Sequence, residues 1–424
     1  MSALSLGCWK LPDLSLRRLL LYGALAGLSG CNAPLMGPGR MGTATMTFGN
    51  TASLPPPAGR GVALLAPLTG PDAAVALALV NAAKLGLGTG TVPPLEVFDT
   101  GSTPAGANAA ATAAVAQGAG LILGPLTDVE TSAVALTMTA SHVDVLAFTS
   151  DGAAARPGIW TLGITPLEQV QALVRAAKAS GHGEIAGLLP LTPLGEAMAQ
   201  ALRTEEPDAR IQFYGDFASM NAATRSLSNY ETRRGPVDAQ IKELRGEHTA
   251  AASAEASRLA RQPVPPPPFN ALVIAETGRG LEELASLLAY YDVNPGPVLV
   301  LGPGLWAAYP AAVAAAGLGG ALYAAPDPAA AADFVSRYTL QFGSTPPALA
   351  AVAFDAGAIA RTATEAGGLD LTALTNPAGF SGADGVLALQ PDGSVRRGLA
   401  VFRVQADGSQ IVRPAPAALP APLL

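Results

Sequence analysis

The sequence predicts an α/β protein with two doubly wound parallel-sheet lobes, a cleft between them and a C-terminal β-hairpin. Short apolar runs such as Val62-Ala-Leu-Leu-Ala66 alternate with longer helical segments as far as Glu365, which is the rhythm of βαβ units. The alternation restarts near Thr165, and this indicates a second lobe. The tail from Gly385 onward instead has extended runs separated by Asp-Gly turns, which are typical of hairpins.

In the first lobe, continuous apolar runs predict strands that are buried on both faces. They lie at 62–66, 95–98, 121–123 and 143–148. Helices are expected between them, at 71–85, 104–117 and 127–141. Pro71 suits the first turn of the first helix, and Thr127 or Asp128 is a suitable N-cap for the third.

The second lobe begins with an N-cap pattern in which Thr165 is followed by Pro166 and, three residues after the cap, by Glu168. Its strands are expected at 185–189, 211–214, 271–275 and 298–301, and its helices at 167–179, 194–202, 281–291 and 348–365. A short extended run at 322–324 and a helix at 333–342 are expected in the stretch after residue 301. The segment from Asn221 to Arg261 is polar and Ala-rich, which predicts helix with a break at Arg234-Gly235-Pro236, and a proline run at 263–268 ends it.

The tail is expected to pair Val386–Leu389 with Leu399–Val404 through an Asp-Gly turn, and a second Asp-Gly turn leads to Ile411-Val412.

The expected domain organisation of the whole chain is a signal peptide (1–30), a flexible Gly/Pro-rich tether (31–59), the two-lobed domain (60–412) and a disordered tail (413–424). The first lobe is placed at about 60–155 and 302–345. The second is placed at about 160–300 and 346–412.

The N-terminus has the features of a secretory signal, because Arg17-Arg18 precede a short apolar run and the small residues Ser29-Gly30. The run is shorter than the roughly 20 residues that span a bilayer. Cys31 directly after Leu-Ser-Gly resembles the lipobox of bacterial lipoproteins, which implies lipidation at Cys31. The alternative is an ordinary signal peptide with a chance cysteine. Asn32 stands where enterobacterial lipoproteins of the inner membrane have Asp, which favours a periplasmic protein anchored to the outer membrane.

Composition argues against several classes of function. The net charge of −7 without a basic block argues against nucleic-acid binding. If Cys31 carries lipid and Cys8 leaves with the signal, then no thiol remains for catalysis, for a disulfide or for a metal. The three histidines are not spaced as metal ligands, and the sequence has no nucleophile elbow or phosphate loop. We therefore expect no enzyme activity, no metal and no cofactor.

Several segments together resemble the type I periplasmic binding proteins, to which the Leu/Ile/Val-binding proteins belong. The resemblance covers about residues 60–412, and its order and spacing are more specific than any one piece. The tail from Gly385 to Ile411 resembles the C-terminal hairpin of that family. The other matching segments are Val62-Ala-Leu-Leu-Ala-Pro-Leu-Thr-Gly70, Asp99-Thr-Gly101, Leu121-Ile-Leu-Gly-Pro125 and Val145-Leu-Ala-Phe-Thr-Ser150.

A narrower resemblance is to the penicillin-binding protein activator lipoproteins, which share this fold. Its segments are Phe269–Ile274, Tyr291-Asp292, Pro295-Gly296, Leu301-Gly-Pro-Gly-Leu-Trp306, Ala325-Pro-Asp-Pro328 and Phe354-Asp355. This resemblance implies a non-enzymatic regulator that binds a peptidoglycan synthase. Enterobacterial members also have an N-terminal helical-repeat domain, which this chain replaces with the short tether.

Ligands of open α/β sheets lie beyond the carboxyl ends of the strands. That rule selects residues in the loops after the predicted strands as candidates for the ligand cleft. Hydroxyls near helix N-termini suit a carboxylate, and Glu276 suits an ammonium group. The alternative is that the Thr and Ser residues are caps or turn formers. The candidates are Thr69, Gly70, Pro125, Thr127, Phe148, Thr149, Ser150, Leu194, Glu276 and Thr277.

Two functions remain open at this stage. The activator resemblance favours a lipid-anchored regulator of a penicillin-binding protein, with the segment Asn221–Arg261 as a possible contact or as a solvated helical flap. The rival is a solute-binding protein that supplies an ABC importer with branched-chain amino acids or related small molecules. Amino-acid-binding relatives place an aromatic residue where this chain has Leu194, and that difference argues against the rival.

Overall fold

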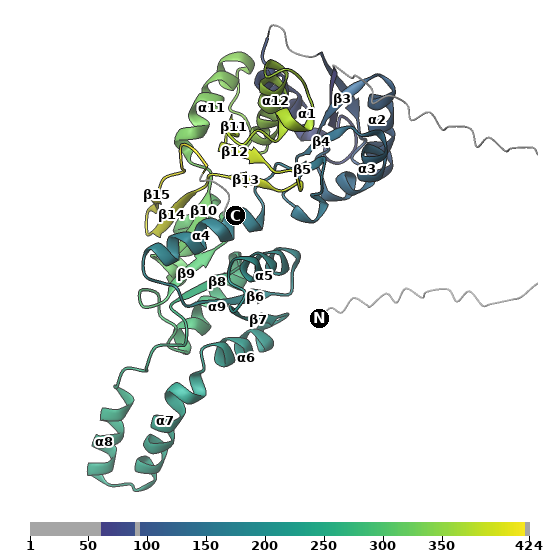
Figure 1. The fold of residues 1–424 in the computed structure, drawn as a ribbon. Helices are drawn as coiled ribbons and strands as arrows, with labels where there is room; N and C mark the ends of the chain where they lie inside the picture. The colour runs from purple at the N-terminus through teal and green to yellow at the C-terminus, as the bar shows by residue number, and fades with distance from the viewer. Residues whose placement is uncertain (1–60, 90–93, 420–424) are drawn as a thin grey trace, which may run out of the picture. The chain divides into compact units, whose positions relative to one another are not determined.

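The computed structural model describes residues 61–89 and 94–419, and it confirms the predicted α/β fold with two parallel-sheet lobes (Figure 1). The signal peptide, Cys31 and the tether lie outside these residues. Lobe I consists of 61–161 and 328–397, and lobe II consists of 166–325 and 400–413. The chain passes between the lobes at 162–165, 326–327 and 398–399.

Lobe I contains a five-stranded parallel sheet with the order β2-β1-β3-β4-β5. Its strands are β1 (Gly61–Ala66), β2 (Leu95–Asp99), β3 (Ala119–Leu123), β4 (Asp144–Ala147) and β5 (Ile159–Thr161). Because alternate side chains of a strand point to opposite faces, Val62 and Leu64 join one apolar core while Ala63 and Leu65 join the other.

Helices cover both faces of this sheet. One face carries α1 (Ala73–Leu87), α11 (Pro328–Phe342) and α12 (Ala350–Glu365), and the other carries α2 (Pro104–Ala116) and α3 (Asp128–Ser141). Small residues bring α1 and α12 together closely. A Cβ atom on Gly86 would lie 2.1 Å from the Phe354 carbonyl oxygen, and one on Gly357 would lie 2.3 Å from that of Ala83.

Lobe II contains a seven-stranded sheet with the order β15-β14-β10-β9-β8-β6-β7. Its strands are β6 (Ile185–Pro190), β7 (Arg210–Tyr214), β8 (Ala271–Ile274), β9 (Leu299–Gly302), β10 (Leu322–Ala325), β14 (Ala400–Gln405) and β15 (Gly408–Arg413). The five strands from β6 to β10 are parallel, whereas β14 and β15 form an antiparallel hairpin at one edge.

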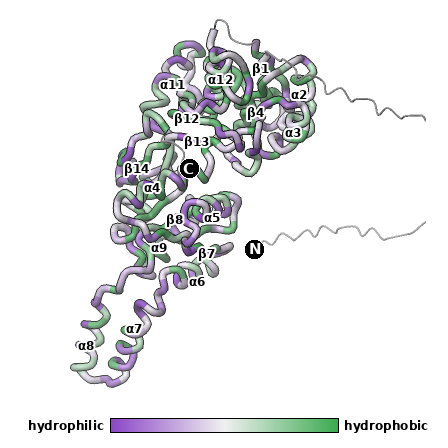
Figure 2. Tube along the Cα trace, in the orientation of Figure 1, coloured by the Kyte–Doolittle hydropathy of each residue, from purple (hydrophilic) through white to green (hydrophobic). Residues whose placement is uncertain are grey.

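The helices of lobe II also form two layers. One layer is α4 (Pro166–Ala179) and α5 (Pro193–Glu205). The other includes α6 (Phe217–Leu227), α9 (Gly278–Tyr290), α10 (Pro310–Val313) and the short helical turns η2 (Gly304–Ala308) and η3 (Ala314–Leu318). Figure 2 shows hydrophobic residues on the strands and on the covering helices of both lobes.

Two helices project from lobe II as a hairpin, α7 (Tyr230–Gly246) and α8 (Ala250–Ala260), and they lie side by side (Figure 1). The predicted helical segment is therefore present, but the predicted break at Arg234-Gly235-Pro236 is wrong. Pro236 lies inside α7, where its missing N–H removes one helical hydrogen bond without ending the helix. The helix boundary falls instead at Asn229, which has φ 54°.

The tail also differs from the prediction. The strand β12 (Gly385–Leu389) pairs with β13 (Val395–Arg397), not with 399–404. A short strand β11 (Phe380–Gly382) completes a three-stranded sheet, and α13 (Leu371–Leu374) precedes it. Residues 400–405 cross to lobe II as β14, because Gly398-Leu399 carries the chain between the lobes before the strand begins.

The lobe boundaries expected beyond residue 300 change accordingly. The strand β10 extends the lobe II sheet, although 302–345 was expected in lobe I. The helix α12 packs on α1 in lobe I, although 346–412 was expected in lobe II. Burial of apolar side chains decides both placements, since the alternation of strands and helices along the sequence does not say which lobe an element joins. Of the tail expected to be disordered, Ala415 packs against the lobe II core, and 420–424 lie outside the described residues.

Candidate functional site

The predicted ligand residues of lobe I lie at the carboxyl edge of its sheet, as expected. Thr69 follows β1, and its hydroxyl donates to Asp99 Oδ2 at 2.7 Å while its backbone N–H donates to Oδ1 at 3.1 Å. The Thr69 hydroxyl and then the Gly101 N–H lower the pKa of the Asp99 carboxyl. Gly70 has φ 90°, and a Cβ there would lie 2.6 Å from the Gly101 carbonyl oxygen. This loop is therefore held by its own polar groups.

Three further candidates maintain the fold of lobe I. The Thr127 hydroxyl is the N-cap of α3, because it accepts from the Glu130 N–H at 3.3 Å and donates to Glu130 Oε2 at 2.9 Å. Pro125 is buried after β3. Phe148 is buried in the core beside α1 and α12. The alternative of a capping role is thus confirmed for Thr127.

The loop after β4 holds the remaining candidates of lobe I. The Thr149 hydroxyl accepts from the Asp151 N–H at 3.0 Å, as in a local turn. Ser150 is exposed, and its hydroxyl has no hydrogen-bond partner within 61–89 and 94–419. Ser150 is therefore the candidate hydroxyl of this lobe that is open to a ligand.

At the edge of lobe II, Glu276 follows β8 and accepts a 2.8 Å hydrogen bond from the Tyr214 hydroxyl through Oε1. Its other carboxylate oxygen would lie 2.2 Å from a Cβ on Gly280, so Glu276 bends back over the start of α9. Burial and then the Glu276 charge raise the pKa of Tyr214. Thr277 interacts with Tyr309, and Leu194 packs against the core formed with α4 and α5.

Exposed apolar side chains lie at the same sheet edges as these hydrogen-bonded polar groups. They follow four strands, β1, β6, β7 and β9: Leu68 and Leu191 lie in loops, Phe217 begins α6, and Leu305 lies in η2. Their exposed fractions are 42% for Leu68, 59% for Leu191, 53% for Phe217 and 57% for Leu305. The sequence analysis did not select them, because an isolated exposed Leu or Phe is common on protein surfaces. Their shared position after strands, together with their exposure, which only the structure shows, makes them functional candidates.

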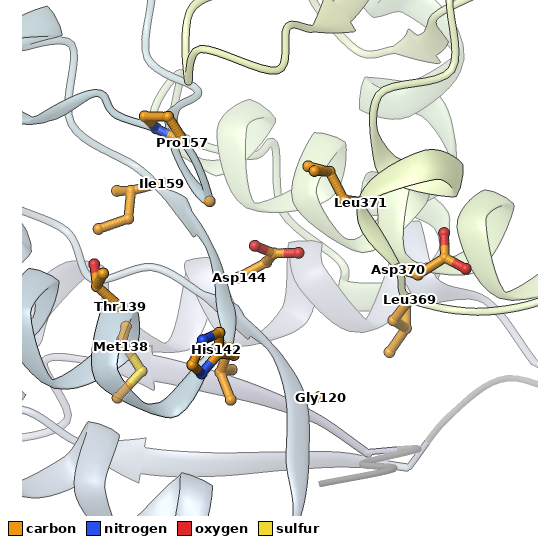
Figure 3. Close-up of a pocket in the computed structure, with 12 residues that line it drawn as sticks. Gly120, Met138, Thr139, His142, Asp144, Pro157, Ile159, Leu369, Asp370 and Leu371 are labelled. Atoms are coloured by element: carbon orange, nitrogen blue, oxygen red, sulfur yellow. The ribbon is translucent and has the colours of Figure 1, made fainter. Parts of the chain in front are cut away.

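Among the cavities that lobe I lines, two differ in their position relative to the predicted cleft. One of about 360 Å³ lies where the lobes meet, between the loop after β4 and α5, and includes Asp151, Thr165, Gln200 and Ser394. The other, of about 620 Å³, lies at the amino ends of β4 and β5, and the lining of neither cavity includes a predicted ligand residue. Asp144 points across it towards the segment with Asp370 and Leu371 (Figure 3).

In this larger cavity, the charge of one carboxylate changes the pKa of another. Burial, and then the negative charge of Asp370, raises the pKa of Asp144 to about 6. His142, at the end of α3, lines the same space. Within the described ranges, His, Cys, Asp and Glu side chains do not gather in groups of three or more that could hold a metal ion.

A buried ionic cluster joins the lobes and was missed by the sequence analysis. Arg397, at the end of β13, donates to Asp355 Oδ2 of α12 at 3.0 Å and to the Leu162 carbonyl oxygen at 2.7 Å. Its Nε lies 3.8 Å from Oε1 of Glu168 in α4, and neither of these two atoms has a hydrogen-bond partner. Arg397 therefore links the crossovers at 162–165 and 398–399.

The electrostatics of this cluster follow from its burial. Desolvation raises the pKa of Glu168, of Asp355 and of the nearby Asp384, and Arg397 opposes each rise. Burial alone would lower the pKa of Arg397, but Asp355, Glu168 and Asp384 together raise it. Because burial outweighs the effect of the single guanidinium, the three carboxyl groups retain protons at a higher pH than exposed carboxyl groups would.

A family model of periplasmic binding proteins matches residues 61–409. The chain belongs to the periplasmic binding protein family. The fold described above is that of the type I members, as the resemblance implied. Across the described ranges, every helix falls short of the length and apolarity that a membrane span requires.

Solved structures with this fold include proteins of both candidate functions. One is described as a branched-chain amino acid ABC transporter from Rhodospirillum rubrum, with 19% identity, a TM-score of 0.59 and coverage of 83% of this chain and 99% of that chain. Another is the C-domain of LpoA from Haemophilus influenzae, a regulator of PBP1A, with 16% identity, a TM-score of 0.57 and coverage of 83% and 99%.

Full-length LpoA from Haemophilus influenzae matches at 16% identity with a TM-score of 0.58, and this chain covers 59% of its length. Among curated proteins, no relative matches by sequence. At these identities the comparisons establish the fold, and the choice between regulator and receptor depends on the site.

Proposed function

We propose that the protein is a non-enzymatic, lipid-anchored regulator of a peptidoglycan synthase of the penicillin-binding protein class. The observation that carries this proposal is the contrast between polar and apolar side chains that follow the strands at the sheet edges. Thr69, Thr127 and Glu276 are engaged by neighbours within the fold, whereas Leu191, Phe217 and Leu305 are exposed. A receptor for a charged amino acid needs free polar groups at that edge, and a protein that binds a partner needs an apolar surface there instead.

The α7–α8 hairpin is the element that we propose contacts the synthase. Only three buried residues, Ile241, Ala256 and Leu259, form its own core. Its base is fixed by Arg233, whose guanidinium donates to the carbonyl oxygens of Pro265 at 2.6 Å and Asp292 at 2.9 Å. An anchored base and a projecting pair of helices supply a pre-organised surface, which reduces the entropy lost on binding.

Removal of the hairpin tests this contact. The Arg234 guanidinium lies 3.5 Å from the carbonyl oxygens of Ala260 and of Gln262, so a short Gly-Ser linker can replace 235–261 without loss of Arg233. We expect the variant to bind a purified bifunctional penicillin-binding protein at least about tenfold more weakly, a loss of about 1.4 kcal/mol. Its thermal unfolding midpoint should stay close to that of the full chain. Unchanged binding would assign the contact to another surface.

The lipid anchor at Cys31 is a separate part of the proposal. Cys31 lies outside the described residues, and the proposal rests on the Leu-Ser-Gly-Cys pattern in the sequence. We expect Cys31→Ala to release the protein from membranes or to block its maturation, as fractionation of the envelope would detect. If the unaltered protein is wholly soluble in the periplasm, the anchor is refuted.

The second candidate function is a solute-binding protein for an ABC importer. It is supported by the likeness to the Rhodospirillum rubrum structure and by Ser150, whose hydroxyl is open. Calorimetry of the full chain in detergent with leucine, isoleucine and valine separates the two functions. We expect no dissociation constant below about 10 µM, which corresponds to roughly −7 kcal/mol. Submicromolar binding would favour the importer function.

A further inference from the structure

Four arginines line one cavity of a chain whose net charge is negative. The cavity has a volume of about 440 Å³ and lies where the end of β13 in lobe I meets α4, β14 and the end of β15 in lobe II. Arg175 comes from α4, Arg396 and Arg397 come from β13, and Arg413 ends β15. The lining contains Gln171 but neither Asp nor Glu.

The four arginines differ in how their charges are balanced. The Arg397 guanidinium faces Asp355 and Glu168 inside the protein. Arg396 has an interaction of its own. Within the described ranges, neither Arg175 nor Arg413 forms a hydrogen bond or ion pair, and both side chains are exposed to solvent.

The strand register explains why these charges meet. Arg413 of β15 pairs with Val401 of β14, so the two side chains share the face of the sheet on which Val401 packs against the α4 core. Arg175 lies on α4, which covers that face. Partial burial lowers the pKa of Arg175, Glu205 acts to raise it, and Arg413 and Arg396 lower it further. Glu205 also accepts a 2.9 Å hydrogen bond from Gln171.

We propose that this cavity is a binding site for a phosphate-bearing anion. Guanidinium groups present planar forks of N–H donors that match phosphate oxygens, and convergent like charges are relieved by an anion between them. Leu399, Val401 and Pro416 supply an apolar wall. The volume exceeds that of a bare phosphate and lies within the range of small-molecule sites, about 300–1,000 Å³. The structure therefore assigns an organic phosphate, which is a soluble ester or a phospholipid headgroup.

The test uses the full chain with Cys31→Ser, so that a lipid anchor does not carry the protein to vesicles. Phenyl phosphate, which joins a phosphate to an apolar ring, is titrated by calorimetry, and phenol and inorganic phosphate are the controls. Co-sedimentation with phosphatidylglycerol vesicles, compared with phosphatidylcholine vesicles, tests the lipid source. We expect submillimolar binding in at least one arm. Binding only to phenyl phosphate identifies a soluble ester, and binding only to vesicles identifies a headgroup.

Variants then connect the binding to the site. Arg175→Gln and Arg413→Gln should each weaken binding about tenfold, because each removes a charge-assisted contact. The matched control is Arg403→Gln, since Arg403 is exposed on the same strand as Val401 and does not line the cavity. Thermal unfolding midpoints verify that each variant is folded. The proposal is overturned if neither arm shows binding, or if Arg403→Gln weakens it as much as the other two.

Discussion

Two helices begin with the same local pattern, and their surroundings differ. Thr127 and Glu130 form a capping box at α3, and Thr165 and Glu168 form one at α4. At α3 the box serves the helix alone. At α4 the glutamate also lies 3.8 Å from Arg397, which reaches Asp355 of lobe I. A capping pattern therefore predicts where a helix starts, but only the tertiary structure shows which caps also connect the lobes.

The largest expected effect comes from removal of the shared guanidinium. Arg397→Met leaves Asp355 and Glu168 buried without a positive charge, so we expect the free energy of unfolding to fall by about 3–5 kcal/mol. Chemical denaturation at pH 7 measures this change. Arg403→Gln, at an exposed position of β14, should stay within about 0.5 kcal/mol of the parent protein. Equal effects of the two variants would contradict the role of the cluster.

A half-buried carboxyl without an arginine partner, that of Asp144, sharpens the contrast. The folded-state pKa of Asp144, about 6, lies above its usual value of 3.8, so its contribution to stability is present below pH 4 and is lost as the pH rises through 6. We expect Asp144→Asn to match the parent below pH 4 and to be more stable by about 1–2 kcal/mol above pH 7, after solvent screening.

The neighbours of Asp144 provide the controls for that pH dependence. Asp370→Asn removes the neighbouring charge and preserves an N-cap for α13, so it should reduce the gain from Asp144→Asn. Because His142 lines the same cavity, the series is repeated with His142→Asn. A stability difference that does not depend on pH would show that packing, not ionisation, causes the effect.

The smallest effects come from the two caps themselves. Thr127→Ala and Thr165→Ala each remove an N-cap hydroxyl, and we expect each to lower the free energy of unfolding by about 1 kcal/mol. Denaturation of the two variants under the same conditions tests whether the helix ends are equivalent. If Thr127→Ala instead left stability unchanged and altered the binding of a small ligand, the predicted cleft role of Thr127 would be supported.

Much of the fold followed from local sequence. Apolar runs such as that of β1 were predicted because a parallel strand covered on both faces needs apolar side chains throughout. The predicted pairing of β12 was wrong because Val395–Arg397 and Ala400–Gln405 are both extended segments that could pair with it. Only their burial in different cores shows which of the two is its partner.

The site was less predictable than the fold. Proximity to strand ends selected Thr127 and Glu276. The Thr-x-x-Glu spacing of Thr127 and Glu130 carried a capping signal in the sequence, whereas the contact between Glu276 and Tyr214 required the placed side chains. The sequence did contain a signal for Asp355 that the analysis did not use. Asp355 is a single acidic residue within the apolar stretch of α12. Arg175 and Arg413 meet only through strand register, and they lie more than 200 residues apart in the sequence.

The measurement that tests the proposed function most directly is the rate of glycan-chain polymerisation by a purified bifunctional penicillin-binding protein, with and without the full chain. We predict that the chain raises this rate in a saturable manner, and that the variant without 235–261 requires a higher concentration for the same effect. A rate that stays unchanged at concentrations well above those of the synthase would contradict the regulator assignment and leave the binding-protein fold as the established result.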